Sequence, residues 1–367
     1  MSVYVVGIGL HPARVAEHGL RLEEMGWRTA RAALDSAGAT RRQIDSVTLG
    51  ACDELDGRPI SSMLMTAPAG GYGTDEIKVT DSGASAFALA YARFLSGESN
   101  FGLVVSWCKT SKTDVSSVMR LRGDPFYTRP LGIDDTVADA LFAQAVADEF
   151  AVDEEEVSRR VAAAYRRAAR NPRGMRHTTP SEEALGQSPL VALPLRAGQR
   201  APFSDGAVAL ALASEQFLRT NPGCKPLARI AGVGWATDEY RLDRQRLRAL
   251  NSARAAWNSA LSQAGLQGAS DLDCIELETP TGWHEAAYIR AFGIEQGDKV
   301  TPSGGSFSQN PTFCTGLINA AEAVLQASGR AGEVQRLGAR WTAAHGCHGY
   351  AQQGNVVIVF ESVGAVQ

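Results

Sequence analysis

The 367-residue sequence has no stretch of about 18 consecutive apolar residues, the length that a helix needs to cross a bilayer. It has no basic excess either, because 36 Lys and Arg face 40 Asp and Glu and leave a formal net charge of −4. Binding of nucleic acid through its phosphates requires the opposite sign, so this function class is excluded. The first residues lack a basic segment before their apolar run, which argues against a secretion signal. We therefore expect a cytoplasmic protein that binds neither nucleic acid nor membrane.

Cysteine pairs of the kind that bind zinc are also missing. The six cysteines are dispersed without Cys-x-x-Cys spacing, at positions 52, 108, 224, 274, 314 and 347. This dispersal argues against a zinc site and against a disulfide scaffold, and no metal site is expected. No GxGxxG motif follows a strand and no GxxxxGK[ST] motif occurs, so dinucleotide and P-loop cofactors lack support. Hydrophobic residues make up 44% of the chain, enough for a large core.

What the sequence does contain is an internal repeat. The segments 32–50 and 258–278 each hold a helix that ends in Ala-Leu-x-x-Ala-Gly, a polar loop and an apolar strand. A second pair of segments, beginning at Asp81 and at Cys314, each opens an amphipathic helix after small residues and closes at Ser-Gly. Strands alternate with helices in both halves, which favours a mostly parallel sheet covered on both faces. We therefore expect an α/β protein with five layers, αβαβα, formed by two mixed, mostly parallel sheets around a shared helix layer.

The repeat places an N-terminal half at residues 1–215 and a C-terminal half at residues 216–367. A more charged region with little strand character, about 110–200, belongs to the first half. Within it, residues 151–172 predict a helix with acidic residues early and arginines late, as the helix dipole favours. These arginines are interpreted first as a solvated face, although a few could contact a phosphate-bearing ligand.

Four segments resemble the thiolase superfamily, most closely its sterol-carrier-type and archaeal-type members. They are TDSGASA (80–86), VALPLRAGQRAPFSDGAVALALAS (191–214), PSGGSFSQNPTFCTG (302–316) and AAHGCHGYAQQGNVVIVFE (343–361). The second is the most specific, because it matches the family's Pro-Leu-Arg … Ser-Asp-Gly-Ala segment. The resemblance covers nearly the whole chain in the family's order and implies the thiolase fold. It also implies acyl-CoA or another acyl thioester as substrate, no bound cofactor, and a homo- or heterodimer or tetramer.

Thiolase chemistry needs a cysteine thiolate at the N-terminus of a buried helix, together with a histidine base and a second cysteine. The resemblance places the nucleophile position at Thr80, and a gapless shift would offer Ser82 or Gly83 instead. None of the three is a cysteine. An alcohol without activation is a far weaker nucleophile at neutral pH, so Thr80 is expected to be inactive.

The other chemical positions also depart from the family pattern. The histidine of Gly-His-Pro corresponds to Asn310, which can donate a hydrogen bond to an oxyanion but cannot take up a proton. The family's Asn or His after the segment 275–277 corresponds to Glu278, and Cys347 alone matches its counterpart. Standard Claisen chemistry by this chain alone is therefore not expected.

The remaining candidates lie mostly in the second half. Glu278, Cys347, His348 and Tyr350 are candidate acids or bases. The turn at Ser303, Gly304 and Gly305 borders the acyl-thioester site in the family, so these residues and Tyr350 are candidate substrate-binding residues, although the glycines also suit a tight turn. His284 and His345 are either buried structural histidines or part of the site, and Cys314 is interpreted first as a small core residue. The segment His345-Gly346-Cys347-His348 lacks a fourth ligand at metal-binding spacing.

The leading hypothesis is a thiolase-like subunit of a complex that forms or cleaves carbon–carbon bonds in acyl-CoA, an acyltransferase complex in the family's terms. This chain would lack its own nucleophile and pair with an active thiolase-like chain. A second hypothesis is a retro-aldolase acting on a β-hydroxyacyl-CoA, which needs a general base and enolate stabilisation but no cysteine. Some thiolase-like aldolases have a small zinc-ribbon and OB-fold partner. A third is an acyltransferase with a displaced nucleophile, Cys347 or Cys314, and a fourth is a non-catalytic binding role.

Overall fold

The computed structural model describes residues 2–80, 82–175, 178–295 and 297–364. Its main sheet takes five strands from the first half of the chain and four from the second. The five are β1 (Val3–Leu10), β2 (Ser46–Gly50), β3 (Asp75–Val79), β4 (Phe101–Lys109) and β7 (Asp205–Ser214). The four are β8 (Ala228–Thr237), β9 (Cys274–Glu276), β10 (Trp341–His348) and β11 (Gly354–Ser362).

The strand order β3-β2-β4-β7-β1-β8-β11-β10-β9 corrects the expectation of two separate sheets. The halves join at β1 and β8, where Tyr4 pairs with Arg229 and Val5 with Ala228. The expectation of a mostly parallel sheet is also wrong. Three pairings are parallel, β2–β3, β2–β4 and β9–β10, and the other five are antiparallel. The strands β10 and β11 follow each other through a short loop, a connection that only an antiparallel pair can use.

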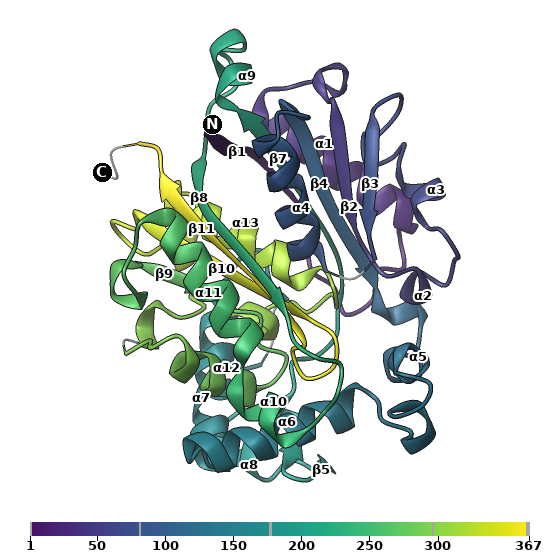
Figure 1. Ribbon diagram of the computed structural model, residues 1–367, viewed down its shortest axis with the longest axis vertical. Coiled ribbons are helices and arrows are strands. Elements are labelled where there is room, and N and C mark those ends of the chain that lie inside the picture. The colour runs from purple at the N-terminus through teal and green to yellow at the C-terminus, as the bar shows by residue number, and fades with distance from the viewer. Residues whose placement is uncertain (1, 81, 176–177, 296, 365–367) are drawn as a thin grey trace.

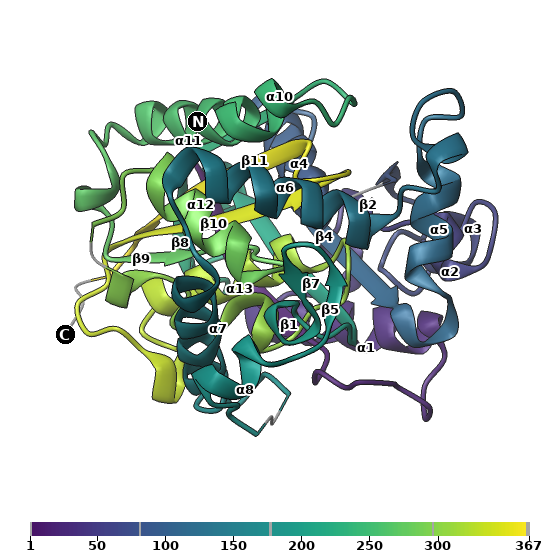
Figure 2. The ribbon, with the colours of Figure 1, turned by 90° about the horizontal axis from the view of Figure 1, so that it is seen from below.

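The expected five layers are present, because the sheet wraps around two buried helices. These are α4 (Gly83–Leu95) and α13 (Thr315–Ala327), which contact each other and strands of both halves. Helix α1 (Leu22–Ala37) covers the outer face of β1 and β7, and α11 (Asn251–Ala264) covers β8 and β11. Figures 1 and 2 show the two halves side by side, with α4 and α13 between their strands. The predicted internal repeat therefore produces two matching half-sheets around one helix layer.

The first strand of each half carries the same packing device. A Cβ on Gly7 or Gly9 of β1 would lie about 2 Å from a backbone oxygen of α1, and a Cβ on Gly232 or Gly234 of β8 would meet α11 in the same way. Glycine at these four positions lets each outer helix lie directly on its strand. The caps predicted at the ends of these helices are confirmed, since Gly38 and Gly265 are left-handed, with φ of 64° and 75°.

Most of the region between β4 and β7 is helical and lies at one end of the sheet (Figures 1 and 2). It contains α5 (Val115–Arg122), α6 (Asp135–Phe150), α7 (Glu154–Ala168), α8 (Glu182–Gly186) and a small hairpin, β5 (Leu190–Ala192) with β6 (Leu195–Arg196). Helix α7 confirms the helix predicted within 151–172. Its arginines are not simply solvated. Arg167 donates to the Thr301 carbonyl at 2.9 Å and pairs with Glu285, so it ties α7 to the second half.

None of the remaining α-helices in the described part of the chain is longer than ten residues. They are α2 (Asp53–Asp56), α3 (Ser62–Met65), α9 (Glu215–Thr220), α10 (Arg244–Ala249) and α12 (Gly282–Ala291). Among the described residues, no helix combines the length and the apolar character that crossing a membrane requires.

Candidate active site

A cavity of about 100 Å³ lies where the two halves meet the helical region. Strands β9 and β10 are parallel and both point their carboxyl ends at it, the position at which α/β sheets usually bind ligands. The loops after these strands, the loop before α13 and the helices α5 and α6 form its walls. The polar side chains among its lining residues are Asp135, Asp139, Arg200, Glu278, His284, Asn310, Thr312, Cys347, His348 and Gln352. Four of the predicted site residues, Glu278, Asn310, Cys347 and His348, are thus brought together.

Glu278 is the acid of this cavity. Its side chain is 6% exposed, and Oε2 accepts the backbone N–H of Cys347 at 3.0 Å. A Cβ on Gly316 or Gly346 would lie 2.9 or 3.4 Å from that oxygen, so two glycines make room for the carboxyl. Burial raises the pKa of Glu278 to about 8, and the Cys347 N–H offsets part of this effect. The carboxyl is therefore mostly protonated at neutral pH and can donate a proton.

Asp139, on α6, is a second carboxyl in the cavity. Burial raises its pKa to about 7. The positive charge of Arg200 opposes this increase, and the negative charge of Asp135 adds to it. Its Oδ1 lies 3.9 Å from Nε2 of His284, and 14% of the Asp139 side chain is exposed. A carboxylate with a pKa near the working pH has the property that a general base needs.

His284, in the first turn of α12, lies beside Asp139. Burial lowers its pKa to about 3, with a smaller effect of His345, so the ring is neutral at pH 7. Its Nδ1 lies 2.9 Å from Oγ1 of Thr281, and that hydroxyl also accepts the backbone N–H of His284. The Thr281 hydroxyl can donate to Nδ1, an arrangement that leaves the ring proton on Nε2, facing Asp139. The ring lines the cavity beside a carboxyl, a position compatible with the chemical role that the sequence left open for His284.

Asn310 supplies a hydrogen-bond donor. Its Oδ1 accepts the Thr315 hydroxyl at 3.1 Å, and its backbone N–H donates to Oγ of Ser204 at 2.9 Å. These contacts hold the side-chain amide at the cavity wall, and its Nδ2 donates a long hydrogen bond of 3.5 Å to the Ala201 carbonyl. A fixed amide N–H of this kind can stabilise an oxyanion without a large reorganisation cost.

All six cysteines are buried and free of disulfides. Burial raises the pKa of all six thiols above the ordinary value of 9.0, for Cys52, Cys108, Cys224, Cys274, Cys314 and Cys347. Cys314 is fully buried at the start of α13, and its pKa rises to about 12. For Cys347, which lines the cavity, the neighbouring Glu278 adds to the effect of burial. A thiol that stays protonated is a poor attacking group.

Thr80 does not lie in the cavity. It is exposed, and α4 begins only at Gly83, with Ser82 as the N-cap whose hydroxyl accepts the N–H of Ala84 at 3.1 Å. Asp81, where the second repeat was expected to begin, lies outside the described residues. The helix start therefore presents a buried Ser82 engaged in capping, and Thr80 precedes it on the surface.

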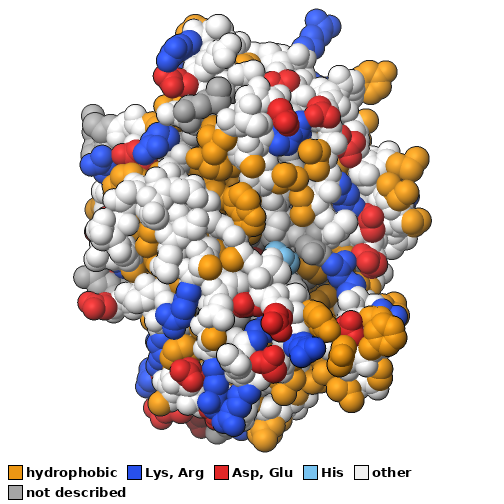
Figure 3. All heavy atoms as spheres, in the orientation of Figure 1, with side chains coloured by type: hydrophobic (Ala, Val, Ile, Leu, Met, Phe, Trp, Pro, Cys, Tyr) orange, Lys and Arg blue, Asp and Glu red, His pale blue; other side chains and the backbone are white. Residues whose placement is uncertain are grey.

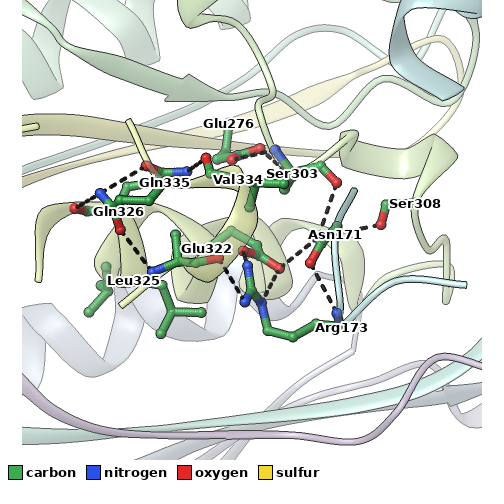
Figure 4. Close-up of polar contacts among 12 residues, drawn as sticks. Asn171, Arg173, Glu276, Ser303, Ser308, Glu322, Leu325, Gln326, Val334 and Gln335 are labelled. Carbon is green, nitrogen blue, oxygen red and sulfur yellow. Dashed lines mark hydrogen bonds and ion pairs between the residues drawn. The ribbon is translucent and has the colours of Figure 1, made fainter. Parts of the chain in front are cut away.

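The predicted substrate-binding turn is held in a buried hydrogen-bond network. Ser303 donates to Oε2 of Glu276 at 2.6 Å, and Nδ2 of Asn171 donates to the Ser303 carbonyl at 3.0 Å. Asn171 also donates to Glu322, which pairs with Arg173. Figure 4 shows this buried network, which links the loop after α7 to β9 and α13. Ser303 is absent from the lining of the cavity because its hydrogen bonds point into this network.

The two glycines of the turn are required by close packing. Gly304 has φ of 87°, and a Cβ there would lie 2.6 Å from the backbone of Ala168. Gly305 has φ of 54°, and its Cβ would lie 3.1 Å from the Leu277 carbonyl. Both positions exclude a side chain for steric reasons, and neither lines the cavity.

Tyr350 and His345 support the site without lining it. The Tyr350 hydroxyl contacts the carbonyl oxygens of Met119 and Ile133 and so holds α5 and the segment before α6 against the loop after β10. His345 is buried, its Nε2 lies 2.8 Å from Oδ1 of Asn355, and burial lowers its pKa to about 4. The interpretation of His345 as a structural histidine is in accord with this geometry. Among the described residues, no three His, Cys, Asp or Glu side chains are grouped to hold a metal ion.

Sequence reasoning missed Asp139 and Arg200. Both belong to the region about 110–200, which the repeat does not cover. One signal was available for Asp139: it stands alone as an acid among Ala138, Phe142 and Ala143, on a stretch of α6 that is otherwise small or apolar. Arg200 pairs with Asp135 at 2.7 Å and closes one side of the cavity, a contact between segments 65 residues apart that no local pattern indicates.

No protein-family model matches the sequence. The acetyl-CoA acetyltransferase of Methanothermobacter thermautotrophicus is 30% identical over 203 residues, which are 50% of this chain and 52% of that protein. Rat sterol carrier protein 2 is 28% identical over 169 residues, 40% of this chain and 31% of that protein. The matched part thus spans about half or less of these curated relatives.

The likeness to solved structures covers the whole chain. Human mitochondrial 3-ketoacyl-CoA thiolase superposes with a TM-score of 0.78 at 17% identity, over 99% of both chains. This chain has the thiolase fold. The structure of the Ltp2-ChsH2(DUF35) aldolase also superposes, with a TM-score of 0.80 at 16% identity over 100% of this chain and 99% of that one. At such low identity these likenesses establish the fold alone.

Proposed function

We propose that this thiolase-fold chain is a carbon–carbon lyase that cleaves β-hydroxyacyl thioesters by acid–base chemistry, without an acyl-cysteine intermediate. The observation that carries the proposal is the composition of the cavity. It holds two carboxyls whose pKa values are raised to about 7 and about 8, together with a protonated thiol and an oriented amide. This set suits proton transfer and oxyanion stabilisation, and it does not suit nucleophilic attack.

In the proposed reaction, the Asp139 carboxylate takes the proton of the β-hydroxyl group. The bond between Cα and Cβ breaks as the carbonyl forms at Cβ, and its electron pair passes to the thioester as an enolate. The Asn310 amide donates a hydrogen bond to the enolate oxygen. Neutral Glu278 delivers a proton to Cα and is reprotonated from solvent, to which Asp139 returns its proton. The products are an aldehyde or ketone and a shortened acyl thioester.

The test compares four variants on 3-hydroxybutanoyl-CoA, with acetyl-CoA and acetaldehyde measured by chromatography. Asp139→Asn and Glu278→Gln should each reduce the cleavage rate by about 10²-fold or more, the usual contribution of one acid or base. Cys347→Ser and Cys314→Ser should keep the rate within about tenfold, because neither thiol reacts. Loss of cleavage in the serine variants, with retention in the carboxylate variants, would overturn the proposal.

A second candidate is the thiolase-like subunit of a heteromeric acyl-thioester complex. One observation favours it: β3, at the end of the sheet, pairs with β2 alone among the described strands, so its other edge can accept a strand from another chain. The structurally similar Ltp2-ChsH2(DUF35) aldolase is named after two components. By analogy, the partner of this chain would be a ChsH2-like protein. Cleavage that appears only after a thiolase-like chain or such a partner is added would favour this candidate.

A further inference from the structure

A second hollow, of about 330 Å³, lies on the opposite side of His348 from the candidate active site. It runs between one face of α4 and the ends of β8 and β11, and most of its lining is apolar. The lining residues are Val79, Ser85, Ala88, Leu89, Ala92, Trp235, Ala236, Thr237, His348, Asn355 and Val356. Figure 3 shows one face of the molecule, on which hydrophobic side chains gather around a hollow near its centre. We call the second hollow the α4–β8 groove.

His348 is the wall that the groove shares with the active-site cavity, because it lines both. It is the last residue of β10, beside Cys347. Its ring is packed directly on the Gly354 backbone, since a Cβ added at Gly354 would lie 2.2 Å from two ring atoms. The two spaces thus share one lining residue, His348, whose ring is held in place by a glycine on the neighbouring strand.

The two spaces differ in size, so they can accept different parts of one substrate. The cavity, at about 100 Å³, holds the reacting carbons of a thioester and little more. The groove, at about 330 Å³, is at the lower end of the range for small-molecule pockets, about 300–1,000 Å³. Trp235, 58% exposed at the groove, offers a large aromatic face to an apolar ligand.

We propose that the α4–β8 groove receives the apolar end of the substrate, the group carried by the β-carbon, and that the protein therefore prefers β-hydroxyacyl thioesters with a bulky apolar substituent there. The inference rests on the proposed lyase function. After the Cα–Cβ bond breaks, the carbonyl carbon of the released aldehyde or ketone lies in the cavity beside Asp139, and only its apolar substituent extends past His348 into the groove. The groove thus sets which carbonyl compound is released.

The turnover arm of the test compares 3-cyclohexyl-3-hydroxypropanoyl-CoA with 3-hydroxybutanoyl-CoA. Ala92→Phe fills the groove from α4, and Ala163→Phe makes the same change at a half-buried alanine of α7 that does not line the groove. Ala92→Phe should lower kcat/KM for the cyclohexyl substrate by roughly tenfold or more and leave the small substrate within about twofold. Ala163→Phe should leave kcat/KM unchanged for both substrates.

The binding arm needs no catalysis. Saturable quenching of tryptophan fluorescence by the cyclohexyl substrate should disappear in Trp235→Phe and in Ala92→Phe, and 3-hydroxybutanoyl-CoA should quench far less. Cleavage without substrate-size selectivity would overturn the groove proposal and leave the lyase function standing. Specific quenching without cleavage would overturn the lyase function and leave the groove as the binding site of the apolar group. Dimerisation that Trp235→Ala abolishes, with unchanged selectivity, would assign the groove to a second copy of the chain and overturn the proposal.

Discussion

Replacing Glu278 by Gln should make the folding stability less dependent on pH. Burial raises the pKa of this carboxyl from its ordinary value of 4.5 to about 8 in the folded chain, so the unfolded chain loses the proton first. The stabilisation is therefore complete below pH 4.5 and is lost as the pH rises through 8. At 1.36 kcal/mol per pKa unit, the loss is roughly 3 kcal/mol at pH 7 and approaches about 5 kcal/mol above pH 8. Gln has no proton to lose, and its amide oxygen can still accept the Cys347 N–H.

The assay is urea unfolding at pH 5, 6, 7 and 8. Between the lowest and highest pH, the wild type should lose several kcal/mol more than Glu278→Gln, on the order of 1.4 kcal/mol per pH unit. Glu276→Gln is the matched control: burial also raises the pKa of Glu276 to about 8, but this residue bonds Ser303 and does not line the cavity. The control should reduce the pH dependence as well, yet keep cleavage activity. Parallel curves for the wild type and Glu278→Gln would show an ionised Glu278 and refute its role as proton donor.

The same geometry leads us to expect three more results. The pH profile of kcat/KM should rise as Asp139 ionises near pH 7 and fall as Glu278 ionises near pH 8. The Asp139→Asn variant should lose most of its activity at every pH. A flat profile between pH 5 and 9 would contradict both assignments. Iodoacetamide at pH 7.5 should label almost no thiol in the folded protein and all six in guanidinium, as mass spectrometry would show; a rapidly labelled cysteine would reveal an activated thiolate. Urea unfolding should show that Gly304→Ala lowers the unfolding free energy by roughly 3 kcal/mol or more, and Gly293→Ala by about 1 kcal/mol. The reason is that of the two added Cβ atoms only the one on Gly304 would collide with backbone atoms. Equal effects of the two substitutions would count against the packing explanation.

The repeat and the family segments predict the fold well, because they are local. The glycine caps at Gly38 and Gly265 and the small residues that open α4 and α13 each mark an element boundary that the structure confirms. Strand direction is not local. Neither the join between β1 and β8 nor the antiparallel pairings at the sheet centre could be predicted from alternating strands and helices, since they depend on where long connections return the chain.

The site was predictable in part for the same reason. Glu278, Asn310, Cys347 and His348 belong to family segments whose order fixes where they meet, and all four line the cavity. Asp139 comes from a region that those segments do not cover, so its position depends on tertiary packing. The Ser303–Gly305 turn resembles the family motif, and its hydrogen bonds and close contacts place it outside the lining of the cavity, so its role in substrate binding stays a prediction.

The central claim is that the chemistry here is proton transfer by buried carboxyls, with no acyl group on sulfur. The most direct measurement is the intact mass of the chain, taken after rapid quenching during turnover of 3-hydroxybutanoyl-CoA, together with the products in the same sample. We predict an unmodified chain while acetyl-CoA and acetaldehyde accumulate in equal amounts. A mass increase of one acyl group, reversed by hydroxylamine, would contradict the claim.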